Sequence, residues 1–163
     1  KAFQKLSLTT GLPADFTLDN SDYFGQAVAS LGDLDGDGVS DLALGKNTGA
    51  VYVVLMNNDS TVKAFQKLSK ETGMPDGFAA DAGDYFGGAA TGLGDLDDDG
   101  VLDLAVGAHA DDDDDGTNTG AVYVVLMNAN GTGKAFQKFT LDEADLFGFS
   151  VANLGDLDGD GLS

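Results

Sequence analysis

The sequence predicts an all-β fold of short antiparallel strands, and three observations support this prediction. Gly, Asp and Asn stand at the breaks between apolar runs, as tight hairpins require, and 24 residues are Gly. The same apolar and turn motifs recur with a period of roughly 60 residues. No stretch carries the 3.6-residue apolar period of an amphipathic helix. We therefore expect almost no helix.

Each repeat is predicted to hold four strands in chain order. In the first repeat, residues 25–31 are small and apolar, residues 42–45 form a short apolar run, residues 50–56 are mostly β-branched or aromatic, and residues 62–68 alternate. Apolar second and third strands indicate burial on both faces. Four-stranded sheets that are covered on both faces and repeat along the chain are typical of β-propeller blades. A sandwich or solenoid of similar hairpins is the alternative.

Four repeated strings define the period. They are KAFQK at Lys1, Lys63 and Lys134, an aromatic-Gly pair at Phe24, Phe86 and Phe147, an Asp loop that begins at Gly32, Gly94 and Gly155, and GAVYVVLMN at Gly49 and Gly120. The repeated aromatic residues are expected to be structural. We expect Tyr52 and Tyr123 in the core, the Phe of each aromatic-Gly pair between blades, and Phe3, Phe65 and Phe136 on the outer strand, half-exposed.

Composition excludes several classes of function. The formal net charge is -20, with 26 Asp, two Glu and eight Lys among 163 residues. Binding to nucleic acid or to an anionic membrane needs a basic patch, so neither is expected. The absence of Cys excludes disulfides, zinc-thiolate sites and a Cys nucleophile. No apolar run approaches the roughly 18 residues of a membrane span.

The first Asp loop has the spacing of a cation site. Asp33, Asp35 and Asp37 stand at positions one, three and five, the carbonyl of Val39 at seven, and Asp41 at nine. The glycine at six permits the turn that points this carbonyl inward. Four carboxylates and one carbonyl are hard oxygen ligands, which favour Ca²⁺ over zinc, copper and Mg²⁺.

The Asp loop recurs twice in register. The second set is Asp95, Asp97, Asp99, Val101 and Asp103, and the third is Asp156, Asp158 and Asp160. The third lacks a carboxylate at position nine, so we expect it to be weak or completed by another chain. Asp98 replaces the glycine at position four of the second loop and adds charge beside the ion. Three copies favour a metal site over a solvated hairpin, and strand-like flanks without Glu at position twelve exclude an EF-hand.

At these residues the chain resembles the FG-GAP repeats of the integrin alpha-subunit β-propeller and of bacterial secreted proteins. The matching residues are Phe24-Gly25 with Gly45, Phe86-Gly87 with Gly107-Ala108, and Phe147-Gly148, together with the Asp loops. The resemblance implies Ca²⁺ in the hairpin between strands one and two, and an extracellular propeller of usually seven blades that serves adhesion or ligand binding. The Pro of the GAP triplet is missing from both repeats.

The repeats predict four segments. Residues 1–23 hold the outer strand of a preceding blade and a connection, 24–85 and 86–146 are two blades, and 147–163 begin a third. Two blades cannot close a propeller, so we expect an incomplete propeller or part of an assembly. Terminal blades with apolar faces indicate self-association or contact with another protein.

Three functions fit these observations. The first is a non-enzymatic, calcium-binding extracellular module for adhesion or ligand binding. The second is a structural subunit that assembles by blade-to-blade contact into a propeller, fibre or surface layer. The third is a calcium-stabilised lectin, with carbohydrate as ligand, or an ancillary domain of a secreted hydrolase. His109, the single His, is assigned no catalytic role. The run Asp111–Asp115 is expected to be a solvated loop, with a weak Ca²⁺ site or a contact for a cationic partner as alternatives.

Overall fold

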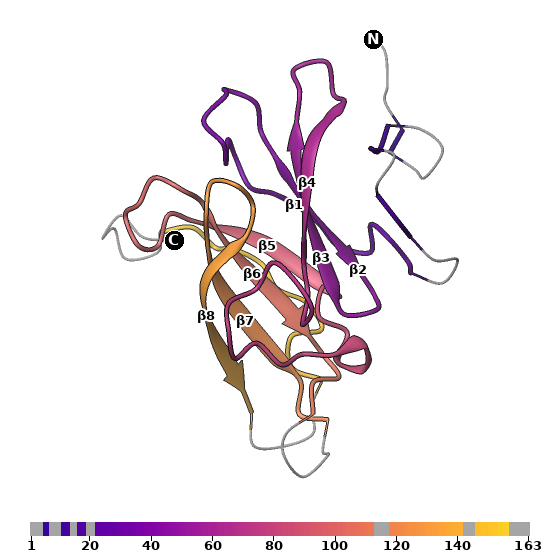
Figure 1. Ribbon diagram of the computed structural model, residues 1–163. Helices are drawn as coiled ribbons and strands as arrows, with labels where there is room; N and C mark the ends of the chain where they lie inside the picture. Colours follow the sequence, from indigo (N-terminus) through magenta and orange to yellow (C-terminus); the bar gives the residue numbers. More distant parts are fainter. Residues whose placement is uncertain are drawn as a thin grey trace.

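The chain forms two four-stranded antiparallel sheets (Figure 1). The computed structural model describes residues 5–6, 11–13, 16–18, 22–112, 118–141 and 146–156. Over these ranges the single helical segment is a 3-10 turn, η1 (Ala82–Asp84). The prediction of an all-β fold with almost no helix is therefore confirmed. In the same part of the chain, no helix has the length and apolar character to cross a membrane.

The first sheet contains four strands in chain order: β1 (Val28–Ser30), β2 (Leu42–Lys46), β3 (Ala50–Met56) and β4 (Val62–Leu68). Strand β1 is shorter than the expected range 25–31. Pairing continues past both of its ends, because Gly25 N–H donates to Gly45 O at 2.9 Å and Leu31 N–H donates to Asp41 O at 2.9 Å. The first hairpin thus spans most of the range that the sequence predicts.

The second sheet repeats this order with β5 (Ala89–Gly94), β6 (Asp103–Ala108), β7 (Ala121–Met127) and β8 (Gly133–Thr140). Both outer hairpins carry a register irregularity at the same place, between Leu55 and Met56 and between Leu126 and Met127. Equivalent sequences therefore fold into equivalent sheets. We call them blade 1 (β1–β4) and blade 2 (β5–β8).

The main core lies between the two blades. Val51, Val53 and Leu55 on one face of β3 belong to the same buried cluster as Tyr123 and Val125 of β7. The burial of apolar side chains from both sheets removes each face from water and holds the sheets together. The face-to-face packing that the apolar strands predict is present between these blades.

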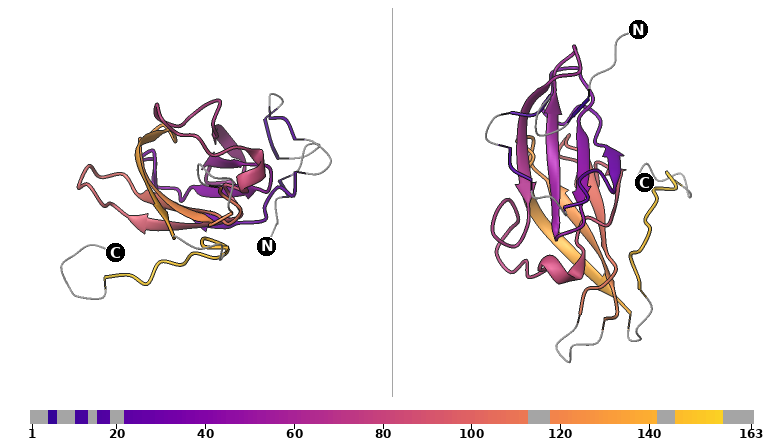
Figure 2. Two further views of the ribbon diagram at one scale, coloured as in Figure 1. Left: turned by 90° about the horizontal axis from the view of Figure 1, so that it is seen from below. Right: turned by 90° about the vertical axis from the view of Figure 1, so that its right-hand side faces the viewer.

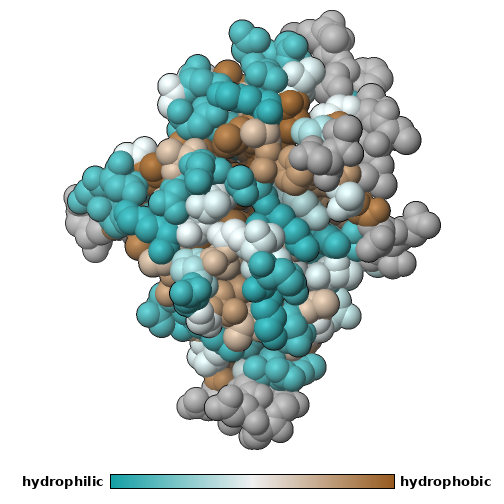
Figure 3. All heavy atoms as spheres, viewed as in Figure 1, coloured by the Kyte–Doolittle hydropathy of each residue, from teal (hydrophilic) through white to brown (hydrophobic). Residues whose placement is uncertain are grey.

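The far face of blade 2 departs from the expectation of burial on both faces. Strand β7 alternates between buried and half-buried residues, and Val122, Val124 and Leu126 are the half-buried ones. Their counterparts in β3 are fully enclosed, because blade 2 covers them. Hydrophilic residues cover most of the molecular face in Figure 3, with apolar atoms showing between them.

Glycines set how closely consecutive repeats approach. A Cβ on Gly45 would collide with the carbonyl oxygen of Gly87, and a Cβ on Gly107 would collide with that of Gly148. Residues 146–156, in yellow in Figure 2, therefore meet blade 2 as blade 2 meets blade 1. Gly87 and Gly148, from the second and third aromatic-Gly pairs, thus each approach the strand-two glycine of the preceding blade.

An aromatic quartet packs against one face of each blade, and in blade 2 this is the face that meets blade 1. Blade 1 joins Phe16, Phe24, Tyr52 and Phe65, and blade 2 joins Phe78, Phe86, Tyr123 and Phe136, with ring centroids 4.6–6.2 Å apart. The core positions of both tyrosines, and the half-buried positions of the outer-strand phenylalanines, are as predicted. The sequence pattern gives no signal for Phe16 and Phe78, which lie outside every described strand. Phe3 is outside the described residues.

Candidate metal centre

The loop between β1 and β2 is held by its own carboxylates. Asp33 accepts hydrogen bonds from the backbone N–H groups of Asp37 at 2.9 Å and Gly38 at 2.8 Å. Asp37 in turn accepts one from Val39 N–H at 2.9 Å. Gly38 has φ of 86°, in the left-handed region that favours glycine. These bonds turn the loop tightly enough to gather its acidic side chains.

The loop between β5 and β6 has the same geometry. Asp95 accepts from Asp99 N–H at 3.0 Å and from Gly100 N–H at 2.7 Å, and Asp99 accepts from Val101 N–H at 2.9 Å. At position four, Asp98 takes φ of 58°, so it keeps the left-handed conformation that Gly36 has in blade 1. Asp tolerates this conformation better than most residues. The exchange of Gly for Asp therefore leaves the loop hydrogen bonds intact.

Three of the four predicted carboxylates converge in each loop. Asp33, Asp35 and Asp37 each offer an oxygen within 4.8 Å of the others, and so do the equivalent residues Asp95, Asp97 and Asp99. Asp35 Oδ1 is buried and accepts no hydrogen bond from the described residues. An orphaned buried oxygen within an all-oxygen cluster fits a hard divalent cation, because such an ion would satisfy it.

The fourth carboxylate braces the sheet instead of joining this group. Asp41 is fully buried, and its two oxygens accept hydrogen bonds from Leu34 N–H at 2.9 Å and Met56 N–H at 2.8 Å. Burial raises the pKa of Asp41, and the charges of Asp35 and Asp37 raise it further. The hydrogen bonds from the two amides lower this pKa and oppose both effects. These two charges affect Asp41 because it lies beside the cluster.

Asp103 repeats this arrangement in blade 2. Its oxygens accept from Leu96 N–H at 2.8 Å and from Met127 N–H at 2.9 Å, and burial raises its pKa. Position nine thus ties the loop to the end of the third strand in both blades. The sequence predicted a ligand at this position, and the structure adds a structural role that residue spacing alone does not reveal.

The predicted carbonyl ligands lie at residues whose side chains are anchored. Val39 and Val101 are half-buried; Val39 packs against the blade 1 cluster that includes Tyr52, and Val101 packs against the core between the blades. This packing fixes the backbone at position seven. Of the third set, Asp156 is exposed, whereas Asp158 and Asp160 lie outside the described residues.

Each described cluster contacts a lysine that the spacing of the loop residues does not predict. Lys63 Nζ lies 2.7 Å from Asp35 Oδ2 and 2.6 Å from Asp37 Oδ2. In blade 2, Lys134 Nζ lies 2.6 Å from Asp97 Oδ2 and 2.7 Å from Asp99 Oδ2. The hydrogen bond from its lysine is the main reason that the pKa of Asp37, and likewise of Asp99, is lowered. The one sequence signal for this contact is the repeated KAFQK string, which begins with these lysines in both blades.

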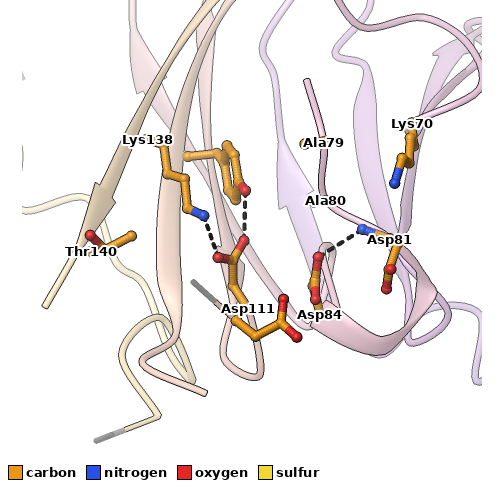
Figure 4. Close-up of a pocket in the computed structure, with 10 residues that line it drawn as sticks. Lys70, Ala79, Ala80, Asp81, Asp84, Asp111, Lys138 and Thr140 are labelled. Carbon is orange, nitrogen blue, oxygen red and sulfur yellow. Dashed lines mark hydrogen bonds and ion pairs between the residues drawn. The ribbon is translucent and has the colours of Figure 1, made fainter. Parts of the chain in front are cut away.

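A second acidic region lines a pocket beside blade 2 (Figure 4). Asp111 is buried there; it accepts a hydrogen bond from Tyr123 Oη at 2.6 Å and pairs with Lys138. The expectation of a solvated loop is therefore wrong for Asp111, because this residue is buried and is paired with the Tyr123 hydroxyl and the Lys138 ammonium. Asp112 is exposed, and residues 113–115 are outside the described part. His109 stacks on Tyr85, with ring centroids 4.9 Å apart.

Comparisons with known proteins agree with the repeats seen in the structure. A family model described as the FG-GAP repeat matches residues 24–54 and 87–125. Integrin alpha-4 of Xenopus laevis is 34% identical over 151 residues, which cover 85% of this chain and 14% of that protein. Integrin alpha-5 of Xenopus laevis is 32% identical over 149 residues, covering 86% and 13%.

A shorter match gives the same result. Integrin alpha-2 of Bos taurus is 34% identical over 90 residues, which cover 52% of this chain and 7% of that protein. The chain thus spans less than one sixth of the length of these relatives. The segments matched by the family model begin at Phe24 and at Gly87, and both run through the Asp loop into the third strand of a blade. The chain therefore belongs to the FG-GAP repeat family, with integrin alpha-like repeats in its two sheets.

Proposed function

We propose that the chain is a calcium-binding part of an extracellular β-propeller and acts in adhesion or in binding a partner protein. One observation carries this proposal: two loops at equivalent positions each bring three carboxylates together, in a protein of net charge -20. Asp33, Asp35 and Asp37 would hold the ion in blade 1, together with the carbonyl of Val39. Like charges at this separation repel each other, so a divalent cation stabilises the loop.

In this proposal Asp41 has two roles: it holds the loop against the sheet, and it supplies the closing ligand of the same ion. Its carboxylate lies close enough for the charges of Asp35 and Asp37 to raise its pKa. A carboxylate oxygen has about two lone pairs, so an oxygen that accepts an amide N–H can also bind a cation. Asp103 has the same place beside the loop of blade 2. The role we propose is binding rather than catalysis.

Titration calorimetry tests this proposal. The monomeric chain should bind about two Ca²⁺ ions, with dissociation constants of roughly 10⁻⁴ to 10⁻³ M as in other extracellular modules. Asp35→Ala should remove one ion and Asp97→Ala the other. Asp76→Ala is the matched control, because Asp76 is exposed and far in sequence from both loops. The absence of any heat of Ca²⁺ binding, or uptake that is unaffected by both loop variants, would contradict the proposal.

Assembly through blade contacts is the second candidate function. The half-buried Val122, Val124 and Leu126 correspond to the three β3 residues that pack against blade 2. A further blade, from another chain or from a partner, would cover them in the same way. Sedimentation over a range of protein concentrations tests this idea, since Val124→Lys should abolish any association. A chain that stays monomeric at high concentration would rule out self-assembly.

A further inference from the structure

Both described lysines that open a KAFQK string reach into the Asp loop of their own blade. Lys63 donates hydrogen bonds to Asp35 and Asp37, and Lys134 donates to Asp97 and Asp99. The four distances between nitrogen and oxygen all lie within 2.6–2.7 Å. The same contact arises independently in two blades, with the same carboxylate oxygens, so it belongs to the repeat.

The topology of the blade explains why this lysine meets this loop. The β1–β2 loop and the β3–β4 hairpin lie at the same end of the first sheet (Figure 1). Lys63 is the second residue of β4 and therefore stands at that end. The Asp41–Met56 hydrogen bond draws the loop toward the same hairpin. A side chain four carbons long then spans the remaining gap between strand and carboxylates.

The ammonium uses the oxygens that a cation would need. Within each loop it binds Oδ2 of the residues at positions three and five. A divalent cation that coordinates these oxygens would meet a positive charge at hydrogen-bond distance, and the two cations would repel each other. The lysine can leave, because its side chain is about 40% exposed in both blades.

We propose that Lys63 and Lys134 are built-in competitors of the divalent cation. Each lysine holds its loop when calcium is scarce and leaves it when the ion binds. This inference rests on the proposed calcium binding and adds its regulation. The lysine lowers the apparent affinity of the site, because the ion must first displace it. It also neutralises part of the loop charge in the calcium-free protein, so the loop keeps its shape without the ion.

Replacement of one lysine tests the competition within a single molecule. Lys63→Met keeps the aliphatic length and removes the charge, so the blade 1 site should bind Ca²⁺ about three- to tenfold more tightly. The blade 2 site should not change, and Lys134→Met should show the reverse pattern. Lys63→Arg keeps the charge and should remain close to wild type. Lys67→Met is the matched control on the same strand, since the charge of Lys67 acts on Glu71.

Amine labelling reports lysine release directly. Addition of Ca²⁺ should increase the acylation rate of Lys63 and Lys134, as read by mass spectrometry, while Lys67 should not change. Unchanged or weaker Ca²⁺ binding by both Met variants, in a wild-type chain that binds Ca²⁺, would overturn this inference and leave the proposed function in place. A wild-type chain that binds no Ca²⁺ and shows no change in labelling would overturn both.

Discussion

The carboxylate of Asp41 hydrogen-bonds to the backbone N–H of Met56 at 2.8 Å and so joins the Asp loop to the far end of β3. Asp103 makes the same bond with Met127 at 2.9 Å. Each aspartate also accepts a second amide from within its loop. Position nine of the loop is therefore tied to the sheet by its own hydrogen bonds.

Removal of this carboxylate should destabilise the calcium-free protein. Asp41→Ala leaves two amides without their acceptor, and each buried, unsatisfied donor costs about 1–3 kcal/mol. Asp41→Asn keeps one acceptor oxygen and should lose about half as much. The free energy of unfolding, measured with urea in the presence of a chelator, gives the comparison.

Asp35→Asn is the control for the structural role of Asp41. It removes a proposed ligand from the carboxylate cluster but leaves the hydrogen bonds of Asp41 to the sheet in place. In chelator this variant should stay within about 1 kcal/mol of wild type, since it loses only one contact with the exposed Lys63. If Asp41→Ala proved as stable as Asp35→Asn under these conditions, position nine would be a ligand without a structural role.

Chelation should lower the melting temperature of the wild-type chain. At about 2 mM free Ca²⁺ and a dissociation constant of about 0.1 mM, linkage gives roughly 1.8 kcal/mol per site. Two sites then correspond to a shift of about 7–14 °C for a domain of this size. Calorimetric scans with Ca²⁺ and with chelator measure it, and Mg²⁺ should restore little of the loss. A melting temperature that does not respond to the chelator would argue against both sites.

Truncation of Phe78 should destabilise the contact between the blades. Phe78 is buried and packs against Phe86, Tyr123 and Phe136, at centroid distances of 4.8–5.5 Å. Phe78→Ala should cost about 3–5 kcal/mol, as is usual for a buried Phe. Urea unfolding of the variant measures this loss. Phe139→Ala on half-exposed β8 should change stability by no more than about 0.5 kcal/mol, and equal losses for the two variants would refute the role of the quartet.

Most of the fold could be predicted because the same signals occur in each repeat. The expected ranges 50–56 and 62–68 agree with β3 and β4 at both ends, since a β-branched run and hairpin residues define them. The short first strand agreed less well, because small residues between glycines give little periodicity. Phe16 and Phe78 could not be assigned, because they lie in irregular segments where no strand pattern places a side chain on a face.

The site could be predicted only in part, for a related reason. Spacing along one loop reveals which carboxylates can converge, and Asp33, Asp35 and Asp37 do converge. Contacts between segments that are distant in the sequence leave no such pattern. Lys63 reaches the loop from the other hairpin of the blade, and Asp111 is paired by Lys138 of β8 and Tyr123 of β7. Tertiary packing decides both contacts.

The two blades differ at a buried aspartate before the aromatic-Gly pair. In blade 1, Asp22 pairs with Lys46 at 2.9 Å. In blade 2 the equivalent residues are Asp84 and Ala108, so this lysine is missing while the carboxylate remains buried. Burial raises the pKa of Asp84, the charge of Asp111 raises it further, and the hydrogen bond from Asp81 N–H opposes both effects (Figure 4).

Substitution by Asn should therefore have opposite effects at the two positions. A raised pKa favours the neutral acid in the folded state, so the stability that Asp84 contributes is present below its unfolded pKa and lost as the pH rises through its folded pKa. Asp84→Asn should accordingly be more stable than wild type at pH 7, by about 1 kcal/mol, and lose this advantage near pH 4. Asp22→Asn should cost about 3 kcal/mol at pH 7, because the largely buried Lys46 loses its counter-charge. Urea unfolding between pH 4 and pH 7, with chelator present, measures both variants. A loss of stability at pH 7 in Asp84→Asn would show that the Asp84 carboxylate has a cationic partner, as Asp22 has.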